Sequence, residues 1–237
     1  MCRAIRFLRF VSPLIVLSVS ASGALADTIA VIGTGNVGAA LGPEFAAQGH
    51  AIVYGHREPG REDVQALVAR TPGDASVALP GAAVVGADMV VLAVPGTSAV
   101  AIAEGLGDLA GKILIDPTNP ISREGGQMSH AAPPRSSNAE LIQAVAPDAF
   151  VVKAFNTLNW QQMVNPETAG GPITIMLAGD NAEAKARVAE LVRGMDLDAV
   201  DVGGVHYAHV LEEMLIMWAE SMRGQPFNYY LRPMPGN

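Results

Sequence analysis

Residues 28 to 38 read TIAVIGTGNVG, in which an apolar, β-branched run leads directly into three glycines with the spacing G-x-G-x-x-G. An Ala-rich segment of helical composition follows, from 37 to 48. A strand, this glycine spacing and a helix in succession form the dinucleotide-binding fingerprint. We expect Gly33 to permit the tight turn, Gly35 to let the backbone approach a pyrophosphate, and Gly38 to let helix and strand pack closely.

The backbone amides of the same turn are the expected phosphate ligands. Thr34, Asn36 and Val37 lie between the glycines, where N–H groups at a helix N-terminus face an anion. The alternative interpretation is a glycine-rich turn of another α/β fold, which the strand and helix on either side make the weaker one.

The rest of the chain repeats the same rhythm of short apolar runs and Ala-rich helical stretches. This rhythm predicts a Rossmann-type, doubly wound, mainly parallel α/β sheet with a small C-terminal helical segment. We expect a dinucleotide-binding domain over 27–157, completed by C-terminal strands and a helix over 158–237 that form the acceptor site. The expected strands are 28–32, 51–54, 76–78, 89–94, 113–115, 150–152, 173–177 and 199–202, and the expected helices are 37–48, 61–69, 97–106, 139–145, 182–195 and 206–222.

Two segments interrupt this rhythm. Residues 121–138 are rich in Ser, Gly and Pro and predict a long loop, and such loops are usually functional or mobile. The final residues, 224–237, are punctuated by proline and predict irregular structure.

The first 26 residues have the pattern of a secretory signal peptide. Arg3, Arg6 and Arg9 precede an uncharged run that ends at Ala24-Leu25-Ala26, a small-residue cleavage pattern. The predicted location is therefore periplasmic or secreted, without stable membrane insertion. The alternatives are an uncleaved anchor, which 17 uncharged residues broken by proline do not favour, and a misplaced start codon, which would leave the protein cytoplasmic.

Charge and cysteine content exclude several classes of function. Without the three leader arginines, 12 basic residues stand against 23 acidic ones, a net charge near −11 that does not suit nucleic acid or anionic lipid. The single cysteine, Cys2, lies in the leader. Disulfides, thiolate metal sites and cysteine nucleophiles are therefore not expected in the mature chain.

The end of the second predicted strand, YGHRE, favours NADP over NAD. An NAD site usually has a carboxylate here to bind the ribose 2′-hydroxyl, whereas Arg57 follows Gly38 by 19 residues and offers a guanidinium for a 2′-phosphate. His56 and Arg61 are further candidate donors. Glu58 is the counter-argument, because it could neutralise Arg57 or itself bind a 2′-hydroxyl.

With these motifs identified, the chain resembles the NADPH-dependent deazaflavin (coenzyme F-420) reductases and the related NADPH domain of the STEAP metalloreductases. The resemblance is carried by VIGTGNVGAALG, YGHRE, VVLAVPGTSA and, most specifically, VVKAFNTLNWQQM, residues 151–163. It implies NADP as cofactor and coenzyme F-420 or a flavin as hydride acceptor. It also implies a nicotinamide near the turn formed by Val94, Pro95 and Gly96, and near Asn156 and Thr157.

The candidate residues near the expected nicotinamide lie after the ends of predicted strands, and the asparagines among them have a second interpretation. Asn156, Thr157 and Pro95 are the candidate catalytic residues, and Val94 and Asn119 are candidate cofactor ligands. Asn119 and Asn156 could equally stabilise turns. In the same region, Lys153 could pair with Asp116 rather than contact phosphate.

Candidates elsewhere are less specific. His206, His209 and Glu213 share a helix face at metal-ligand spacing, but no third firm ligand is evident and we predict no metal site. Leu211, Leu215 and Trp218 form an apolar stripe that would serve core packing, a homodimer contact or a wall of the acceptor slot. In the long loop the candidate acceptor contacts are Gln127, Met128, His130 and Arg135, and a solvated loop explains them as well.

The sequence therefore predicts an NADPH-dependent oxidoreductase that passes hydride to a small-molecule acceptor, a deazaflavin or flavin-like compound. Hydride transfer between two cofactors needs no nucleophile or metal, so a catalytic triad is not required, and the sequence shows no pattern of one. The alternatives are reduction of a small imine or a metal chelate, and an exported, non-catalytic dinucleotide-binding protein. The predicted signal peptide favours the last alternative, because a chain exported in the unfolded state could not carry bound NADPH across the membrane.

Overall fold

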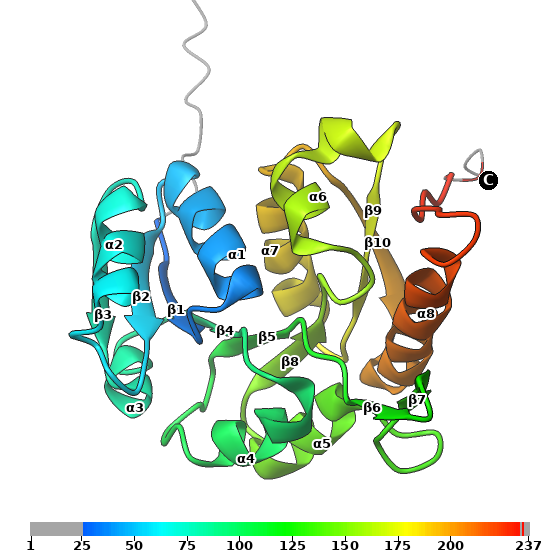
Figure 1. Ribbon diagram of the computed structural model, residues 1–237. Coiled ribbons are helices and arrows are strands. Elements are labelled where there is room, and N and C mark those ends of the chain that lie inside the picture. The colour runs from blue at the N-terminus through cyan, green and yellow to red at the C-terminus, as the bar shows by residue number, and fades with distance from the viewer. Residues whose placement is uncertain (1–25, 233, 235–237) are drawn as a thin grey trace, which may run out of the picture.

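An eight-stranded, mainly parallel sheet runs through the protein, for which a computed structural model describes residues 26–232 and 234 (Figure 1). All neighbouring strands pair in parallel except β8 and β9, which meet antiparallel. Six neighbouring strands lie in the order β3-β2-β1-β4-β5-β8, which is the doubly wound order 3-2-1-4-5-6 when the strands of this sheet alone are counted along the chain. Strands β9 and β10 extend the sheet beyond β8. Across the sheet the order is β10 (Asp198–Gly203), β9 (Thr174–Ala178), β8 (Phe150–Lys153), β5 (Ile113–Asp116), β4 (Met89–Leu92), β1 (Thr28–Ile32), β2 (Ala51–Gly55) and β3 (Ala75–Ala78).

Helices cover both faces of this sheet. In Figure 1, α1, α6 and α7 lie on one side of β4, β5 and β8, and α4 and α5 lie on the other. The predicted Rossmann-type α/β class is therefore confirmed. The helices are α1 (Asn36–Ala47), α2 (Glu62–Arg70), α3 (Pro80–Ala83), α4 (Ala99–Glu104), α5 (Asn138–Val145), α6 (Trp160–Val164), α7 (Ala182–Arg193) and α8 (Ala208–Ser221), with 3-10 turns η1 (Gly96–Ser98), η2 (Pro166–Ala169) and η3 (Val205–Tyr207).

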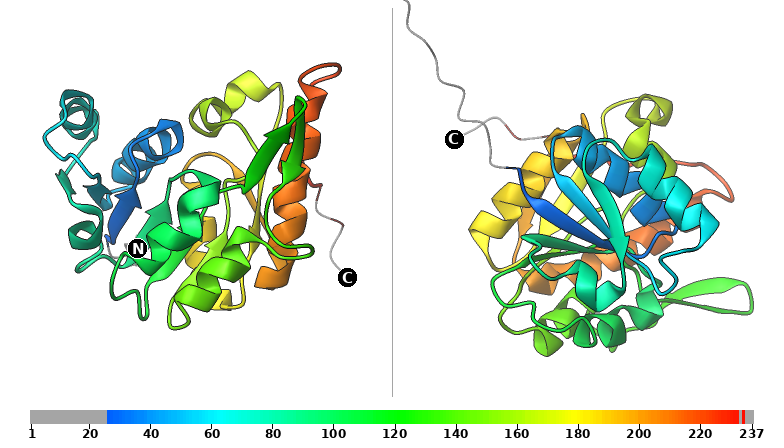
Figure 2. Two further views of the ribbon diagram at one scale, coloured as in Figure 1. Left: turned by 60° about the horizontal axis from the view of Figure 1, so that its bottom comes forward. Right: turned by 90° about the vertical axis from the view of Figure 1, so that its left-hand side faces the viewer.

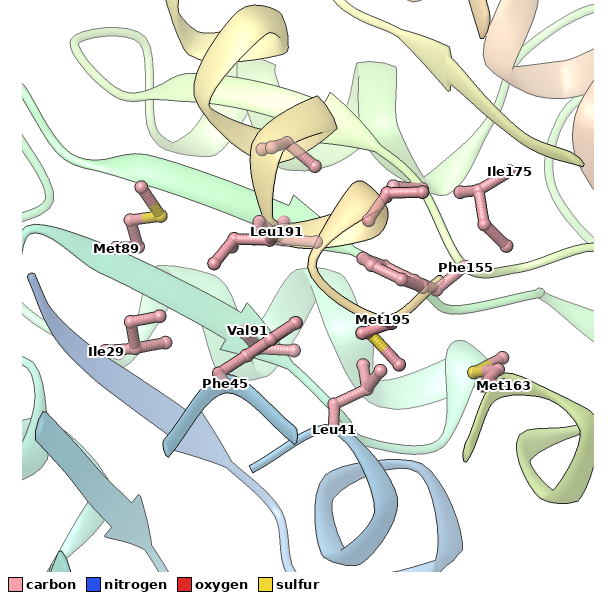
Figure 3. Packing of buried hydrophobic residues seen from close by; sticks show 14 of the residues in the cluster. Ile29, Leu41, Phe45, Met89, Val91, Phe155, Met163, Ile175, Leu191 and Met195 are labelled. Carbon is pink, nitrogen blue, oxygen red and sulfur yellow. The ribbon is translucent and has the colours of Figure 1, made fainter. Parts of the chain in front are cut away.

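The larger of two apolar clusters lies between the sheet and the layer formed by α1, α6 and α7. Figure 3 shows Phe45 of α1, Leu191 of α7 and Met163 of α6 directed toward the sheet strands. Phe45 and Phe155 pack with ring centroids 6.0 Å apart. Burial of such side chains stabilises the fold by about 1.5–3 kcal/mol each. This packing holds α1, and with it the glycine turn, against the strand ends.

Proline inside α1 is tolerated because another side chain replaces the lost donor. Pro43 has no N–H to give to the carbonyl of Ala39, four residues earlier. Arg70 of α2 donates to that carbonyl through Nη2, at 3.2 Å. The substitution of donors ties α2 to α1 on the same side of the sheet.

The predicted loop at 121–138 is wrong in its first half, which forms a β-hairpin. Strands β6 (Ile121–Glu124) and β7 (Gln127–His130) pair antiparallel around Gly125 and Gly126, both with positive φ, as a two-residue hairpin turn requires. Their side chains are mostly polar, so the sequence lacks the alternation that indicates a strand. Figure 2 shows this hairpin beside α8.

The described part of the chain begins at Ala26. The predicted signal peptide lies outside the described residues, apart from Ala26. The described residues after Gly224 contain no helix or strand, in agreement with the prediction of irregular structure. Within residues 26–232 and 234, no helix has the length and apolar character needed to cross a bilayer.

Candidate active site

The three glycines of the fingerprint meet different surroundings. Gly33 has φ +100°, and a Cβ there would lie 2.2 Å from the carbonyl oxygen of Ala93. A Cβ on Gly38 would lie 2.0 Å from the oxygen of Gly33. A Cβ on Gly35 would meet nothing within 4 Å. Gly33 and Gly38 are therefore needed for packing, whereas Gly35 keeps open space clear at the N-terminus of α1.

A cleft of about 820 Å³ opens beyond the carboxyl ends of β1, β2 and β4. This is where the strand order reverses, because the chain passes from β1 outward to β2 and β3 and then returns to β4 on the other side. Such a point is the usual ligand position in an open α/β sheet. Eight of the predicted site residues line the cleft: Gly33, Thr34, Gly35, His56, Arg57, Arg61, Val94 and Pro95.

Six predicted site residues lie outside the cleft lining: Asn36, Val37, Gly38, Asn119, Asn156 and Thr157. Asn36 is exposed as the first residue of α1, and Val37 packs partly against the core. Asn156 and Thr157 are both 2% exposed, so the structure does not present either side chain on an open rim.

The asparagine pair forms a bridge between strand ends rather than an open donor set. Asn119 Nδ2 donates to the carbonyl of Asn156 at 3.0 Å, and Asn156 Nδ2 donates to Asn119 Oδ1 at 2.9 Å and to the carbonyl of Leu211 in α8. Asn156 Oδ1 is buried and has no partner among the described residues. The turn-stabilising interpretation therefore accounts for the amide nitrogens, and this oxygen is left able to accept.

Basic side chains gather at the β2 end of the cleft. Arg57 is exposed and has no hydrogen bond or ion pair within the described part of the chain, so Glu58 does not neutralise it there. His56 Nδ1 lies 2.9 Å from the backbone nitrogen of Glu58 and 3.1 Å from its carbonyl oxygen, so the backbone occupies this ring nitrogen and Nε2 is the one left for a ligand. This end of the cleft is suited to a phosphate.

Sequence reasoning missed one acidic residue in the cleft, Asp63. Arg61 donates to it through Nε at 2.6 Å and through Nη2 at 2.7 Å. The guanidinium of Arg61 lowers the pKa of the Asp63 carboxyl, and the carboxylate in turn raises the pKa of Arg61. Asp63 lies two residues after Arg61 in the first turn of α2, a position where an acidic residue is explained by the helix dipole alone.

A fully buried ionic cluster lies at the carboxyl ends of β5 and β8. Lys153 donates to Asp116 at 2.9 Å, to Glu212 at 2.6 Å and to the carbonyl of Thr118, and all three ionic groups are 0% exposed. The structure thus places Lys153 on Asp116, the alternative weighed from the sequence. Glu212 was not anticipated, although its place on the helix face of Leu215, three residues later, signals a buried carboxylate in need of a cation.

Two contacts join this cluster to the turn after the cleft-lining Pro95 and to the hairpin. Asn138 donates through its backbone N–H to Glu212 at 3.0 Å, and through Nδ2 to the carbonyl of Gly96 at 2.7 Å. His130, the last residue of β7, pairs through Nε2 with the second oxygen of Glu212 at 2.6 Å. His130 is therefore a partner of the cluster, and the hairpin end is held to α8.

A second cleft, of about 790 Å³, lies between α6 and the end of α8 with the segment after it. Both tryptophans of the chain, Trp160 and Trp218, line it together with Phe227 and several amide side chains. The buried Oε1 of Gln162, another lining residue, has no partner within the described residues. Aromatic faces and neutral amides suit an uncharged planar ring.

The other candidates on α8 remain apart from both clefts. His209 Nδ1 contacts the carbonyl of His206 at 2.6 Å, and Glu213 is exposed. Among residues 26–232 and 234, no group of three or more His, Cys, Asp or Glu side chains is arranged to hold a metal ion.

The residues present fit a dinucleotide with a 2′-phosphate. Gly35 leaves space where a pyrophosphate would approach α1, and α1 has no acidic residue in its first turn to repel it. Arg57 supplies a guanidinium without a partner among the described residues at the other end of the same cleft. Fold and site together define the class of dinucleotide-binding proteins of the Rossmann type.

Comparisons with known proteins narrow this class. The profile of the family described as NADP oxidoreductase coenzyme F420-dependent matches residues 28–120. A proposed F420-dependent NADP reductase from Arthrobacter sp. FB24 superimposes with a TM-score of 0.80 at 32% identity, covering 88% of this chain and 100% of that one. The chain belongs to this family, and the class that the family defines is that of NADP-dependent oxidoreductases.

Two further relatives show how far the similarity extends. Rat Metalloreductase STEAP3 is 29% identical over 201 residues, which cover 82% of this chain and 38% of the rat protein. This chain thus spans well under half the length of that relative. A reductive aminase from Aspergillus terreus, in complex with NADPH and ethyl-5-oxohexanoate, has a TM-score of 0.61 at 19% identity, over 84% of this chain and 62% of that one. At 19% identity, the similarity to the reductive aminase shows a shared fold alone.

Proposed function

We propose that the protein binds NADPH in the cleft beyond β1, β2 and β4 and transfers its hydride to a deazaflavin (coenzyme F-420) or flavin-like acceptor. The observation that carries the proposal is that one cleft contains both the open glycine edge at Gly35 and Arg57, whose guanidinium has no partner in the part of the chain that the structure describes. The first feature suits a pyrophosphate and the second a 2′-phosphate. Family membership gives independent support for the cofactor.

The protein's task in this reaction is to position two rings and exclude water. When bound, the nicotinamide supplies a hydride, so that NADPH, an acceptor and one proton yield NADP⁺ and the reduced acceptor. Pro95 ends the wall beyond β4, and Gly96 lies so close to Asn119 that a Cβ there would be 1.9 Å from the Asn119 oxygen. The turn that would face the nicotinamide is thereby fixed.

The cleft that contains both tryptophans is the proposed place of the acceptor ring. The chain itself links this cleft to the strand ends: Asn119 is hydrogen-bonded to Asn156. Helix α6, which lines the cleft, begins at Trp160, four residues after Asn156. Trp218, in the predicted stripe of α8, supplies the opposite wall. An uncharged flat ring would stack on these aromatic faces and bond to the amides.

Nucleotide binding without catalysis is the second candidate function. The observation that favours it is the burial of Asn156 and Thr157, which withholds the two expected polar catalytic side chains from open solvent. The two candidates differ in turnover but share the nucleotide cleft. Binding and oxidation must therefore be measured separately.

The experiment uses protein lacking residues 1–26, with NADPH and NADH titrated by calorimetry and oxidation followed at the nicotinamide absorbance band. Tighter binding of NADPH and its oxidation by coenzyme F-420 or a flavin would support hydride transfer. Binding without oxidation by any acceptor, including imines and ferric chelates, would favour the binding protein. Equal affinity for NADPH and NADH would refute the NADP assignment.

The acceptor site has its own optical readout. Because both tryptophans line the aromatic cleft, an acceptor ring bound there should quench most of the intrinsic tryptophan fluorescence. A Trp218→Phe variant should bind NADPH normally and the acceptor less tightly. Acceptor turnover without any change in fluorescence would place the acceptor elsewhere.

Export and self-association are further proposals. Asp27, the residue after the proposed cleavage site, pairs with Arg187 of α7, so a chain beginning there would retain this contact. N-terminal sequencing of native protein that gives Asp27 first would support export, and Met1 would contradict it.

A homodimer through α8 is proposed from the exposed Val210 and Met217, and sedimentation of a monomer at micromolar concentration would contradict it.

A further inference from the structure

Asp63 stands in a position that the proposed cofactor would contest. Its carboxylate lies among the lining of the nucleotide cleft, at the end that holds Arg57 and Arg61. Of the two arginines, Arg57 has no partner in the described residues, whereas two N–H groups of Arg61 are taken by Asp63 at 2.6 and 2.7 Å. The cleft therefore presents one open guanidinium and one that is already neutralised.

The contact geometry matches what a phosphate would make. A guanidinium binds a carboxylate and a phosphate by the same bidentate arrangement of two N–H groups. The two oxygens of Asp63 thus occupy the fork of Arg61 that phosphate oxygens would use. For Arg61 to bind a 2′-phosphate through this fork, it must first release Asp63.

The same carboxylate can act in the opposite sense on a nucleotide that lacks the phosphate. A ribose 2′-hydroxyl is bound in NAD sites by an acidic side chain, which accepts its proton in a hydrogen bond. Asp63 is the acidic residue among those that line this cleft. One side chain thereby opposes the 2′-phosphate and favours the 2′-hydroxyl.

We propose that Asp63 is a specificity-determining residue of the nucleotide cleft: by holding Arg61 it limits the preference for NADPH over NADH. The inference rests on the proposed binding of NADPH in this cleft and adds a residue that sets its selectivity. Both side chains are well exposed, with 49% of Arg61 and 65% of Asp63 accessible, so exchange of partners needs no movement of the core. An exposed ion pair of this kind contributes little to stability. Asp63 can therefore be substituted with little loss of folding free energy.

The test compares Asp63→Asn with Glu62→Gln in affinity for NADPH and NADH. Glu62 is also exposed in the first turn of α2, but it makes no hydrogen bond to Arg61 within the described residues, so its variant removes an equal charge without freeing the guanidinium. Asp63→Asn should bind NADPH about two- to fivefold more tightly, the range that an exposed ion pair represents. It should bind NADH no better than the wild type, and Glu62→Gln should leave the ratio within twofold of the wild type.

Failure of this inference is separable from failure of the proposed function. If the wild type prefers NADPH and Asp63→Asn leaves that preference unchanged, or Glu62→Gln raises it equally, Asp63 is no specificity determinant. If the wild type itself shows no preference, the NADP assignment falls first. Circular dichroism of both variants shows whether α2 is retained, since each loses one charge that favours its N-terminus.

Discussion

Lys153 and Glu212, 59 residues apart in the chain, form an ion pair of 2.6 Å that is completely buried. Asp116 binds the same ammonium group, so one lysine is shared by two buried carboxylates. The pair joins the end of β8 to α8, and Asn138 extends the contact to the carbonyl of Gly96, the residue after the cleft-lining Pro95. The geometry of the proposed nicotinamide end therefore depends on a charge cluster rather than on apolar packing alone.

Removing the shared lysine should be strongly destabilising. Lys153→Met would leave Asp116 buried without a counter-charge and Glu212 with His130 as its remaining side-chain partner in the described residues, which costs about 3–5 kcal/mol in free energy of unfolding. Lys185→Met is the matched control, because Lys185 also donates to a carboxylate, Asp201, and to a backbone carbonyl. Asp201 is 53% exposed and would be solvated after the change, so this variant should lose about 1 kcal/mol or less. Urea unfolding measures both, and equal losses would contradict the role of burial.

The buried tyrosine near the carboxyl end of β2 predicts a decline in stability at alkaline pH. Burial raises the pKa of Tyr54, whose hydroxyl donates to Thr71 Oγ1 at 2.8 Å because Thr71 gives its own proton to Leu67. The contribution of the neutral phenol is complete below the unfolded-state pKa, about 10. It is lost as pH rises toward the higher folded-state value.

A comparison of phenylalanine variants isolates this effect. Tyr54→Phe should lose about 1 kcal/mol at pH 7, the value of one hydrogen bond, and should show a smaller decline between pH 10 and 11 than the wild type. Tyr207→Phe, at an exposed position, should follow the wild type throughout. Denaturant midpoints measured from pH 7 to 11 check both expectations. Parallel curves for all three proteins would show that Tyr54 does not titrate differently in the folded state.

The sequence predicted what local patterns determine. The strand, glycine turn and helix around Gly33 depend on neighbouring residues, and the predicted strand boundaries agree with the structure to within about two residues. The hairpin at 121–130 escaped detection because its pairing buries no apolar face. Its Gly125-Gly126 pair was the available signal.

The site residues that were missed depend on the folded arrangement. Glu212 acquires its meaning from Lys153, and the burial of Asn156 comes from α8, which provides the carbonyl of Leu211 as its partner. Asp63 lies two residues from Arg61, yet its importance depends on both side chains reaching the cleft. Local spacing cannot supply such information, because these contacts join elements that are distant in the chain or depend on the shape of a cavity.

Replacing Arg57 should remove most of the selectivity for NADPH. A charge-assisted bidentate contact contributes about 1.5–3 kcal/mol, so Arg57→Ala should weaken NADPH binding about tenfold or more while changing NADH binding little. Arg193→Ala is a suitable control, because Arg193 is exposed at the end of α7 and does not line the cleft. Calorimetric titration of both nucleotides gives the ratio. An Arg57→Ala protein that keeps the wild-type ratio would show that the 2′-phosphate is bound elsewhere.

The two glycines of the turn should separate folding from ligand binding. Gly33→Ala places a Cβ 2.2 Å from the Ala93 oxygen at a φ of +100°, so it should destabilise the fold by about 1–3 kcal/mol or more from backbone strain and the clash. Gly35→Ala meets no protein atom within 4 Å and should unfold at nearly the wild-type denaturant concentration. Its methyl group would occupy the space that a pyrophosphate needs, so NADPH affinity should fall about tenfold or more. Denaturant unfolding for stability and calorimetric titration for NADPH affinity together test the contrast. A Gly35→Ala protein that binds NADPH as tightly as the wild type would mean that no phosphate approaches this backbone.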